Sequence, residues 1–233
     1  MAKGCGQNSA GRVSYATFVL GGALRSSPLS LYSRTSESIV SPFEYLLPLT
    51  SVLVGLAIAD LATSLHRLLE ARRRVQWDWL PLLAALLALL AVLDLWWGFY
   101  GYTGRSEWEF AQFLPIFVQL VILFLLCASA LPDEVPSDDG LDLHVFYQSN
   151  GSYFWFLYAA YIFSILAQDA FTYAASGLPE QMSTVSVLAG SIPNLLLIAL
   201  FVGLALVHRR WLHMVAVPGL IVYQIVEWSG RVL

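Results

Sequence analysis

Acidic side chains stand inside apolar stretches of the sequence at four positions: Asp60, Asp94, Asp169 and Glu227. A lone carboxylate in hydrocarbon costs ~2.5 kcal/mol or more, so each of these must be paired, hydrated or protonated. Two amides, Gln168 and Gln224, lie close to Asp169 and Glu227 in the sequence. If Asp94 converges with these groups, the set would line an outward-facing polar cavity suited to protons, cations or cationic solutes. The alternative is a hydrogen-bonded network that only joins helices.

Asp60 belongs to a separate group of polar residues on one helix face. Thr63 and Arg67 follow it at i+3 and i+7, which places all three side chains on the same face. This spacing indicates a proton- or cation-binding site that acts as an inner gate. The alternative is an ion pair between Asp60 and Arg67 at the membrane rim, which would hold the helix in register.

The sequence contains no nucleophile motif, phosphate-binding loop or HExxH pair in a recognisable context, so we do not expect an enzyme. Its histidines fall at expected helix ends or in loops, without a known ligand spacing: His66, His144, His208 and His213. Cys5 and Cys127 are too few for a disulfide framework or a zinc site. We therefore expect no metal or other cofactor.

The elements that hold these residues are membrane-spanning helices. Hydrophobic residues make up 58% of the 233 residues, charged residues only 12%, and the mean hydropathy is +0.68. These values lie outside the range of soluble domains and indicate an integral membrane protein. The lipid bilayer is thus the expected partner, together with copies of the chain or subunits of a membrane complex. The net charge of −4 argues against nucleic acid.

Apolar runs of spanning length predict an all-α bundle of six transmembrane helices within residues 41–233. The expected helices are about 43–69, 78–101, 108–131, 152–175, 185–208 and 211–230. Residues 1–40 are rich in serine, glycine and arginine. They are interpreted as a disordered extension, a targeting segment, or the product of a start codon placed too far upstream.

Arginines predict the orientation. Arg67 and residues 72–74 lie near the first expected connection, and Arg209 and Arg210 lie in the fifth. An even number of crossings separates the two connections, so both should face the cytoplasm, with both termini outside. The chain is similar to small bacterial multi-pass proteins. That resemblance implies a place in the bacterial inner membrane but no activity.

A short internal similarity relates the two halves. Asp60 and Thr63 in the first helix match Asp169 and Thr172 in the fourth, each near the end of its helix. Three helices per half would make this a 3+3 inverted repeat, as in many secondary transporters. The alternative is a chance match in apolar sequence. The sequence therefore favours a small transporter or channel-like protein, with an accessory subunit of a larger membrane complex as the second hypothesis.

Overall fold

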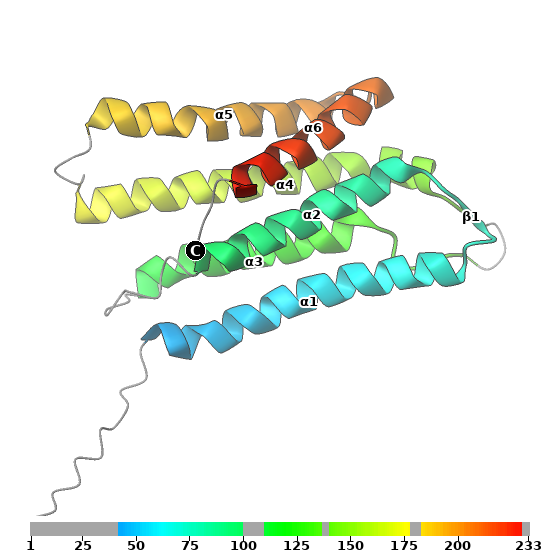
Figure 1. The fold of residues 1–233 in the computed structure, drawn as a ribbon, viewed down its shortest axis with the longest axis horizontal. Helices are drawn as coiled ribbons and strands as arrows, with labels where there is room; N and C mark the ends of the chain where they lie inside the picture. Colours follow the sequence, from blue (N-terminus) through cyan, green and yellow to red (C-terminus); the bar gives the residue numbers. More distant parts are fainter. Residues whose placement is uncertain (1–41, 100–109, 137–139, 178–182, 230–233) are drawn as a thin grey trace, which may run out of the picture. The chain divides into compact units, whose positions relative to one another are not determined.

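The computed structural model describes residues 42–99, 110–136, 140–177 and 183–229. Six helices make up most of these residues: α1 (Pro42–Glu70), α2 (Trp79–Gly98), α3 (Phe110–Ala130), α4 (Leu143–Ser176), α5 (Thr184–Leu206) and α6 (Arg210–Ser229) (Figure 1). Each is long and apolar enough to cross a membrane. The predicted helical architecture is therefore confirmed for the described residues. The expected N-terminal extension, 1–40, lies outside them.

Helix α4 begins nine residues before the predicted start at 152, so that boundary is wrong. The cause is a cap: the Asp142 carboxylate accepts hydrogen bonds from the backbone N–H groups of His144 and Val145, at 2.8 and 3.4 Å. Such a cap satisfies donors that have no partner within the helix. The added turns mix polar and apolar residues, and Asn150 donates to the Ser129 carbonyl at 2.7 Å, which joins α4 to α3. Apolar length alone cannot detect them.

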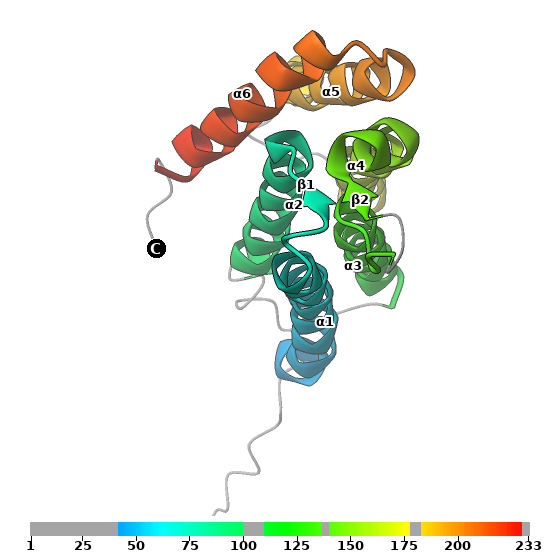
Figure 2. The same ribbon diagram turned by 90° about the vertical axis from the view of Figure 1, so that its right-hand side faces the viewer.

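Helix α2 is the centre of the bundle. It packs against α1, α3, α4 and α6, and Figure 2 shows it between α1 and α6. Its buried face carries alanines at the contact positions: Ala84, Ala85, Ala88 and Ala91. Small side chains let helix backbones approach closely. The close contact favours helix packing even where burial of apolar surface contributes little. The central place of α2 thus follows from its alanine-rich face.

The packing of the first three helices is not repeated in the last three. Helix α1 packs on both α2 and α3, whereas α5 packs chiefly on α4, and α6 chiefly on α2. An inverted repeat would place α4, α5 and α6 in mutual contacts like those of α1, α2 and α3. The described helices therefore do not show the predicted 3+3 repeat.

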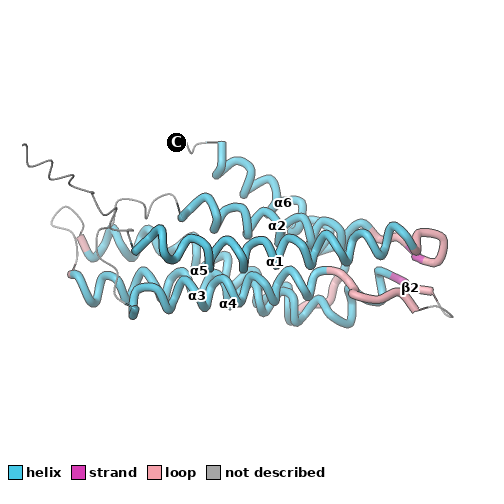
Figure 3. The backbone as a smooth tube through the Cα atoms, turned by 90° about the horizontal axis from the view of Figure 1, so that it is seen from below, coloured by secondary structure: helices cyan, strands magenta, loops and turns pink. Residues whose placement is uncertain are grey.

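Three connections meet at one end of the bundle, which we call the connection end. The α1–α2 connection contains β1 (Val75–Gln76), and the segment before α4 contains β2 (Leu141–Asp142). These two-residue strands pair in parallel beyond the helix ends (Figure 3). The α5–α6 turn joins them, because Arg210 donates to Asp78 at 2.9 Å. The two arginine-bearing connections therefore lie at the same end of the bundle.

Candidate functional site

A cavity of about 290 Å³, called here the acid cavity, lies among α2, α4, α5 and α6. Its polar lining comes from all four helices: Asp94, Tyr158, Tyr161, Asn194, Tyr223, Gln224, Glu227 and Trp228. Its other lining residues are aliphatic side chains and Phe201. The structure therefore brings three of the residues singled out in the sequence, Asp94, Gln224 and Glu227, to one hollow.

The cavity exists because α5 and α6 bury their side chains chiefly in the parts that lie toward the connection end. The buried residues of α5 are Phe201, Leu204 and Ala205, all in its last two turns. Farther from the connection end, α5 exposes large apolar side chains such as Leu188 and Leu195. Helix α6 buries one face, which includes Val217, against the α2 side. The outer parts of the two helices therefore leave space between α4 and α2.

Asp94 is the acid that the structure holds most specifically. It lies about one turn before the end of α2, and its Oδ1 atom accepts a hydrogen bond from Trp228 Nε1 of α6 at 2.9 Å. The side chain is half-buried. Glu227, its neighbour in the cavity lining, is exposed. Asp94 is thus fixed in orientation by α6 while it lines the cavity.

A second cavity of about 180 Å³, called here the amide cavity, adjoins the acid cavity and is also lined by Asp94. Its polar lining is Asp94, Gln119, Tyr161, Gln168 and Asp169. Gln119 donates from Nε2 to Gln168 Oε1 at 2.6 Å, which joins α3 to α4. Asp94, Tyr161 and Ile165 line both cavities. The predicted single cavity is therefore two adjoining hollows, both lined by Asp94.

The structure does not bring Asp60 and Thr63 into either cavity. Thr63 is exposed and donates to the Ala59 carbonyl of its own helix at 2.7 Å. The expected Asp60–Arg67 ion pair is not among those formed in the described ranges. Arg67 instead donates to the Asp133 carbonyl at 2.6 Å. The buried Oδ2 atom of Asp60 has no hydrogen-bond partner among the described residues.

An aromatic layer closes the acid cavity on the side of the connection end. It consists of Trp155, Tyr158 and Phe201, each at most 3% exposed. The ring centroids of Tyr158 and Phe201 are 4.5 Å apart, and Trp155 stacks on Phe201 at 5.7 Å. Such contacts favour a tightly packed, water-excluding layer.

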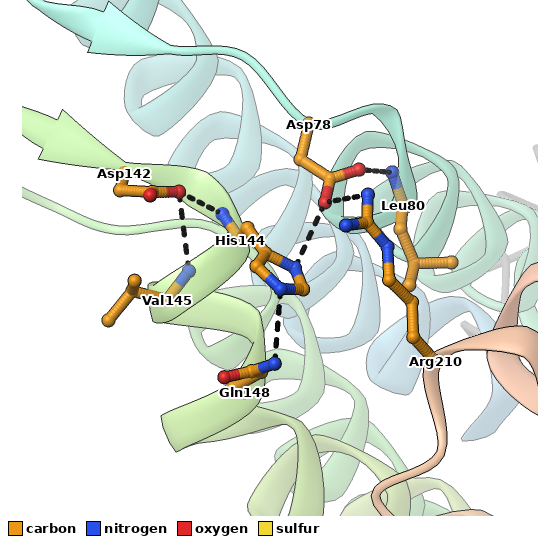
Figure 4. Close-up of polar contacts among 7 residues, drawn as sticks. All are labelled: Asp78, Leu80, Asp142, His144, Val145, Gln148 and Arg210. Atoms are coloured by element: carbon orange, nitrogen blue, oxygen red, sulfur yellow. Dashed lines mark hydrogen bonds and ion pairs between the residues drawn. The ribbon is translucent and has the colours of Figure 1, made fainter.

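Beyond the aromatic layer lies a polar group that sequence reasoning missed, the Asp78 cluster (Figure 4). The Asp78 carboxylate accepts from the Leu80 N–H at 3.2 Å and from Arg210 Nη2 at 2.9 Å. His144 Nδ1 lies 3.3 Å from Asp78 Oδ2, and His144 Nε2 is 3.0 Å from Gln148. One carboxylate therefore caps α2 and joins it to α4 and α6.

Two further hydrogen bonds link the neighbourhood of the Asp78 cluster to the aromatic layer. The Tyr147 hydroxyl accepts from Trp155 Nε1 at 3.0 Å and lies 2.9 Å from His213 Nδ1. His213 Nε2 lies 3.0 Å from the Val207 carbonyl at the end of α5. His213 is buried, so its two contacts satisfy a ring that would otherwise be costly to desolvate. The histidine thus has a structural role in joining α4, α5 and α6.

The missed residues left different signals in the sequence. Asp78 directly precedes an apolar run, which is the usual position of a helix cap. Its partner Arg210 is 132 residues away and could not be paired with it from spacing. Gln119, Tyr161 and Trp228 resemble ordinary packing or interface residues until the helices are placed.

Comparison of the chain with protein-family models, curated proteins and solved structures yields no match.

Proposed function

We propose that this chain is an integral membrane protein that binds a cation in the acid cavity and carries it across the bilayer. The observation that carries the proposal is the position of Asp94, which lines the acid cavity and the amide cavity together. A carboxylate that lines two adjoining hollows is suited to bind a cation that enters either of them.

The charges of the two cavities support a cationic ligand. Asp94 and Glu227 line the acid cavity, and Asp94 and Asp169 line the amide cavity. The described lining residues of both include no lysine, arginine or histidine. Carboxylates in a low-dielectric cleft raise the local cation concentration. Gln168 and Gln224 add amide oxygens that can accept from, or coordinate, the ligand.

The arrangement of the bundle supports alternating access. The acid cavity lies toward the end that the arginines assign to the outside, and the aromatic layer closes it toward the connection end. Arg72, Arg73 and Arg209 are exposed at the connection end, as expected for a cytoplasmic face. In this proposal the structure is the outward-facing state, and Trp155 and Phe201 must separate to release the cation inside.

The test is cation flux in proteoliposomes, with dyes that report pH and membrane potential. We expect an imposed gradient to drive flux in wild type. Because Asn and Gln keep the shape but not the charge, Asp94→Asn and Glu227→Gln should lower that flux at least tenfold. Glu70→Gln is the matched control, since Glu70 is an exposed acid at the end of α1 and lines neither cavity.

Two outcomes would contradict the proposal. Flux that persists in folded Asp94→Asn protein would remove Asp94 from the path. Wild type that carries neither protons, alkali cations nor organic cations would exclude transport of these ions and favour the accessory-subunit hypothesis. Under that hypothesis the same substitutions would weaken co-purification of a membrane partner.

A further inference from the structure

We infer that the ligand of the acid cavity is a small organic ammonium ion, an inference that rests on the proposed cation-binding function. The evidence is the aromatic lining of the cavity beside its two acids. Among the described residues, five aromatic side chains line it: Tyr158, Tyr161, Phe201, Tyr223 and Trp228. A proton or a small alkali ion makes no use of such a lining. An ammonium ion with apolar substituents contacts ring faces through cation–π attraction and hydrophobic burial.

Two of these aromatic residues, Tyr158 and Trp228, use their hydrogen-bond donors within the protein. Tyr158 donates its hydroxyl proton to the Leu87 carbonyl at 3.3 Å. Trp228 donates its ring N–H to Asp94. Both donors are therefore used within the protein, and what these two residues add to the cavity is ring surface. The carboxylates of Asp94 and Glu227 supply the negative charge at one part of that surface.

The volume of the cavity favours a small organic ligand over a bare ion or a drug-sized molecule. Pockets for drug-sized ligands begin at roughly 300 Å³ and are often larger. The acid cavity, at about 290 Å³, therefore suits a smaller organic molecule. A bare alkali ion would leave most of this space empty or filled with water. Divalent metal ions need several hard ligands around one point, and in the described ranges no three His, Cys, Asp or Glu side chains lie close enough to hold a metal ion.

Tyr223 offers the sharpest test of the aromatic contribution. It is 45% exposed, so its replacement disturbs the bundle less than replacement of buried Tyr158 or Tyr161. Tyr223→Phe keeps the ring and removes the hydroxyl, whereas Tyr223→Leu removes the ring and keeps an apolar side chain. The probe is radiolabelled tetraethylammonium, bound at equilibrium to the purified full-length protein in detergent micelles.

We expect saturable binding to wild type, with an affinity within about threefold in Tyr223→Phe. Binding should weaken on the order of tenfold in Tyr223→Leu, because a cation–π contact is lost. Asp94→Asn should also weaken it at least tenfold. A measurement on wild type alone gives an independent check: choline should displace the probe, whereas an uncharged alcohol of the same shape, and equimolar potassium, should not.

The outcomes separate this inference from the proposed function. If tetraethylammonium fails to bind while wild type conducts protons or alkali cations, the inference is overturned and the proposed function stands. Equal affinities in folded Tyr223→Leu and Tyr223→Phe, or displacement by the uncharged alcohol, would also overturn it. If no cation binds or moves, both fail together.

Discussion

Helix α2 carries an aspartate near each end, and the two are used in different ways. Asp78 directly precedes the helix, is 5% exposed, and has Leu80, His144 and Arg210 around its carboxylate. Asp94, about 24 Å farther along the helix axis at the usual rise per residue, is half-buried and lines two cavities. The same side chain therefore stabilises the fold at one end and faces an open hollow at the other.

The difference comes from what surrounds each carboxylate. Asp78 meets an arginine, a histidine and a helix N-terminus, groups that can compensate a negative charge. Asp94 meets a neutral Trp228 N–H and a cavity lined by a second acid, Glu227. A carboxylate beside an arginine has little reason to attract a ligand, whereas one in a cavity whose described lining residues include no basic side chain does. Substitutions should therefore separate stability from cation binding.

The largest expected effect is the loss of stability on removal of the Asp78 carboxylate. Asp78→Ala loses the cap of α2 and the bond to Arg210, and should lower the free energy of unfolding by about 3 kcal/mol. Asp78→Asn should cost less, since an asparagine oxygen still accepts from the Leu80 N–H. SDS titration in mixed micelles measures both. Equal losses in the two variants would contradict the capping role.

Asp94→Asn is the matched control at the other end of α2. An asparagine oxygen keeps the acceptor for Trp228 Nε1, so the free energy of unfolding should change by less than about 1 kcal/mol. A loss as large as that of Asp78→Ala would show that both aspartates stabilise the fold, and the comparison would fail.

A second prediction concerns the backbone at the two ends of the bundle. Gly140 precedes β2 with φ of 69°, and a Cβ there would lie 2.6 Å from the Arg74 carbonyl oxygen. Gly177 ends α4 with φ of 75°, and no neighbour among the described residues lies within 4 Å of such a Cβ. Gly140→Ala should therefore cost about 2 kcal/mol and Gly177→Ala about 1 kcal/mol. Thermal unfolding would measure both losses, and a larger loss in Gly177→Ala than in Gly140→Ala would contradict the prediction.

A third prediction compares two buried tyrosines of α4. Tyr147→Phe leaves the Trp155 N–H and His213 Nδ1 without their partner. This loss should cost about 1.5 kcal/mol. Tyr158→Phe removes one longer bond, 3.3 Å to the Leu87 carbonyl, and should cost only about 0.7 kcal/mol. Unfolding in micelles would measure both losses. Equal losses would show that the hydrogen bonds of Tyr147 stabilise the fold no more than the single bond of Tyr158.

Apolar length predicted the helices well because a helix long and apolar enough to span a bilayer leaves a long apolar run in the sequence. The first helix, expected at 43–69, is Pro42–Glu70. The failure at α4 has the same cause, since a criterion based on apolar runs detects only the continuous apolar part of a longer helix. The turns from Leu143 are held by the Asp142 cap and by the Asn150–Ser129 bond.

The candidate site was predictable only in part. Asp94, Gln224 and Glu227 were identifiable because an acid or amide in an apolar run is conspicuous. The division of the predicted cavity into two hollows, with Asp169 in the amide cavity, was not, since it depends on which helices pack together. Nor could Asp78 be matched with Arg210, because a contact across 132 residues has no periodic signature. The sequence shows which polar residues lie within an apolar run and roughly how far along it. Which of them contact each other depends on how the helices pack.

The smallest expected change in stability completes the comparison. Glu227 is exposed and lines the acid cavity, so Glu227→Gln should alter the free energy of unfolding by less than about 0.5 kcal/mol. The same variant should lose cation binding at least tenfold, because a neutral amide replaces one of the two acids among the cavity's described lining residues. Asp78→Asn should do the opposite, losing stability while folded molecules still bind the cation. Both quantities are measured on one preparation of each variant. If the two variants lose stability and binding in the same proportion, the two ends of α2 do not have separate roles, and the acid cavity is only another part of the structural network.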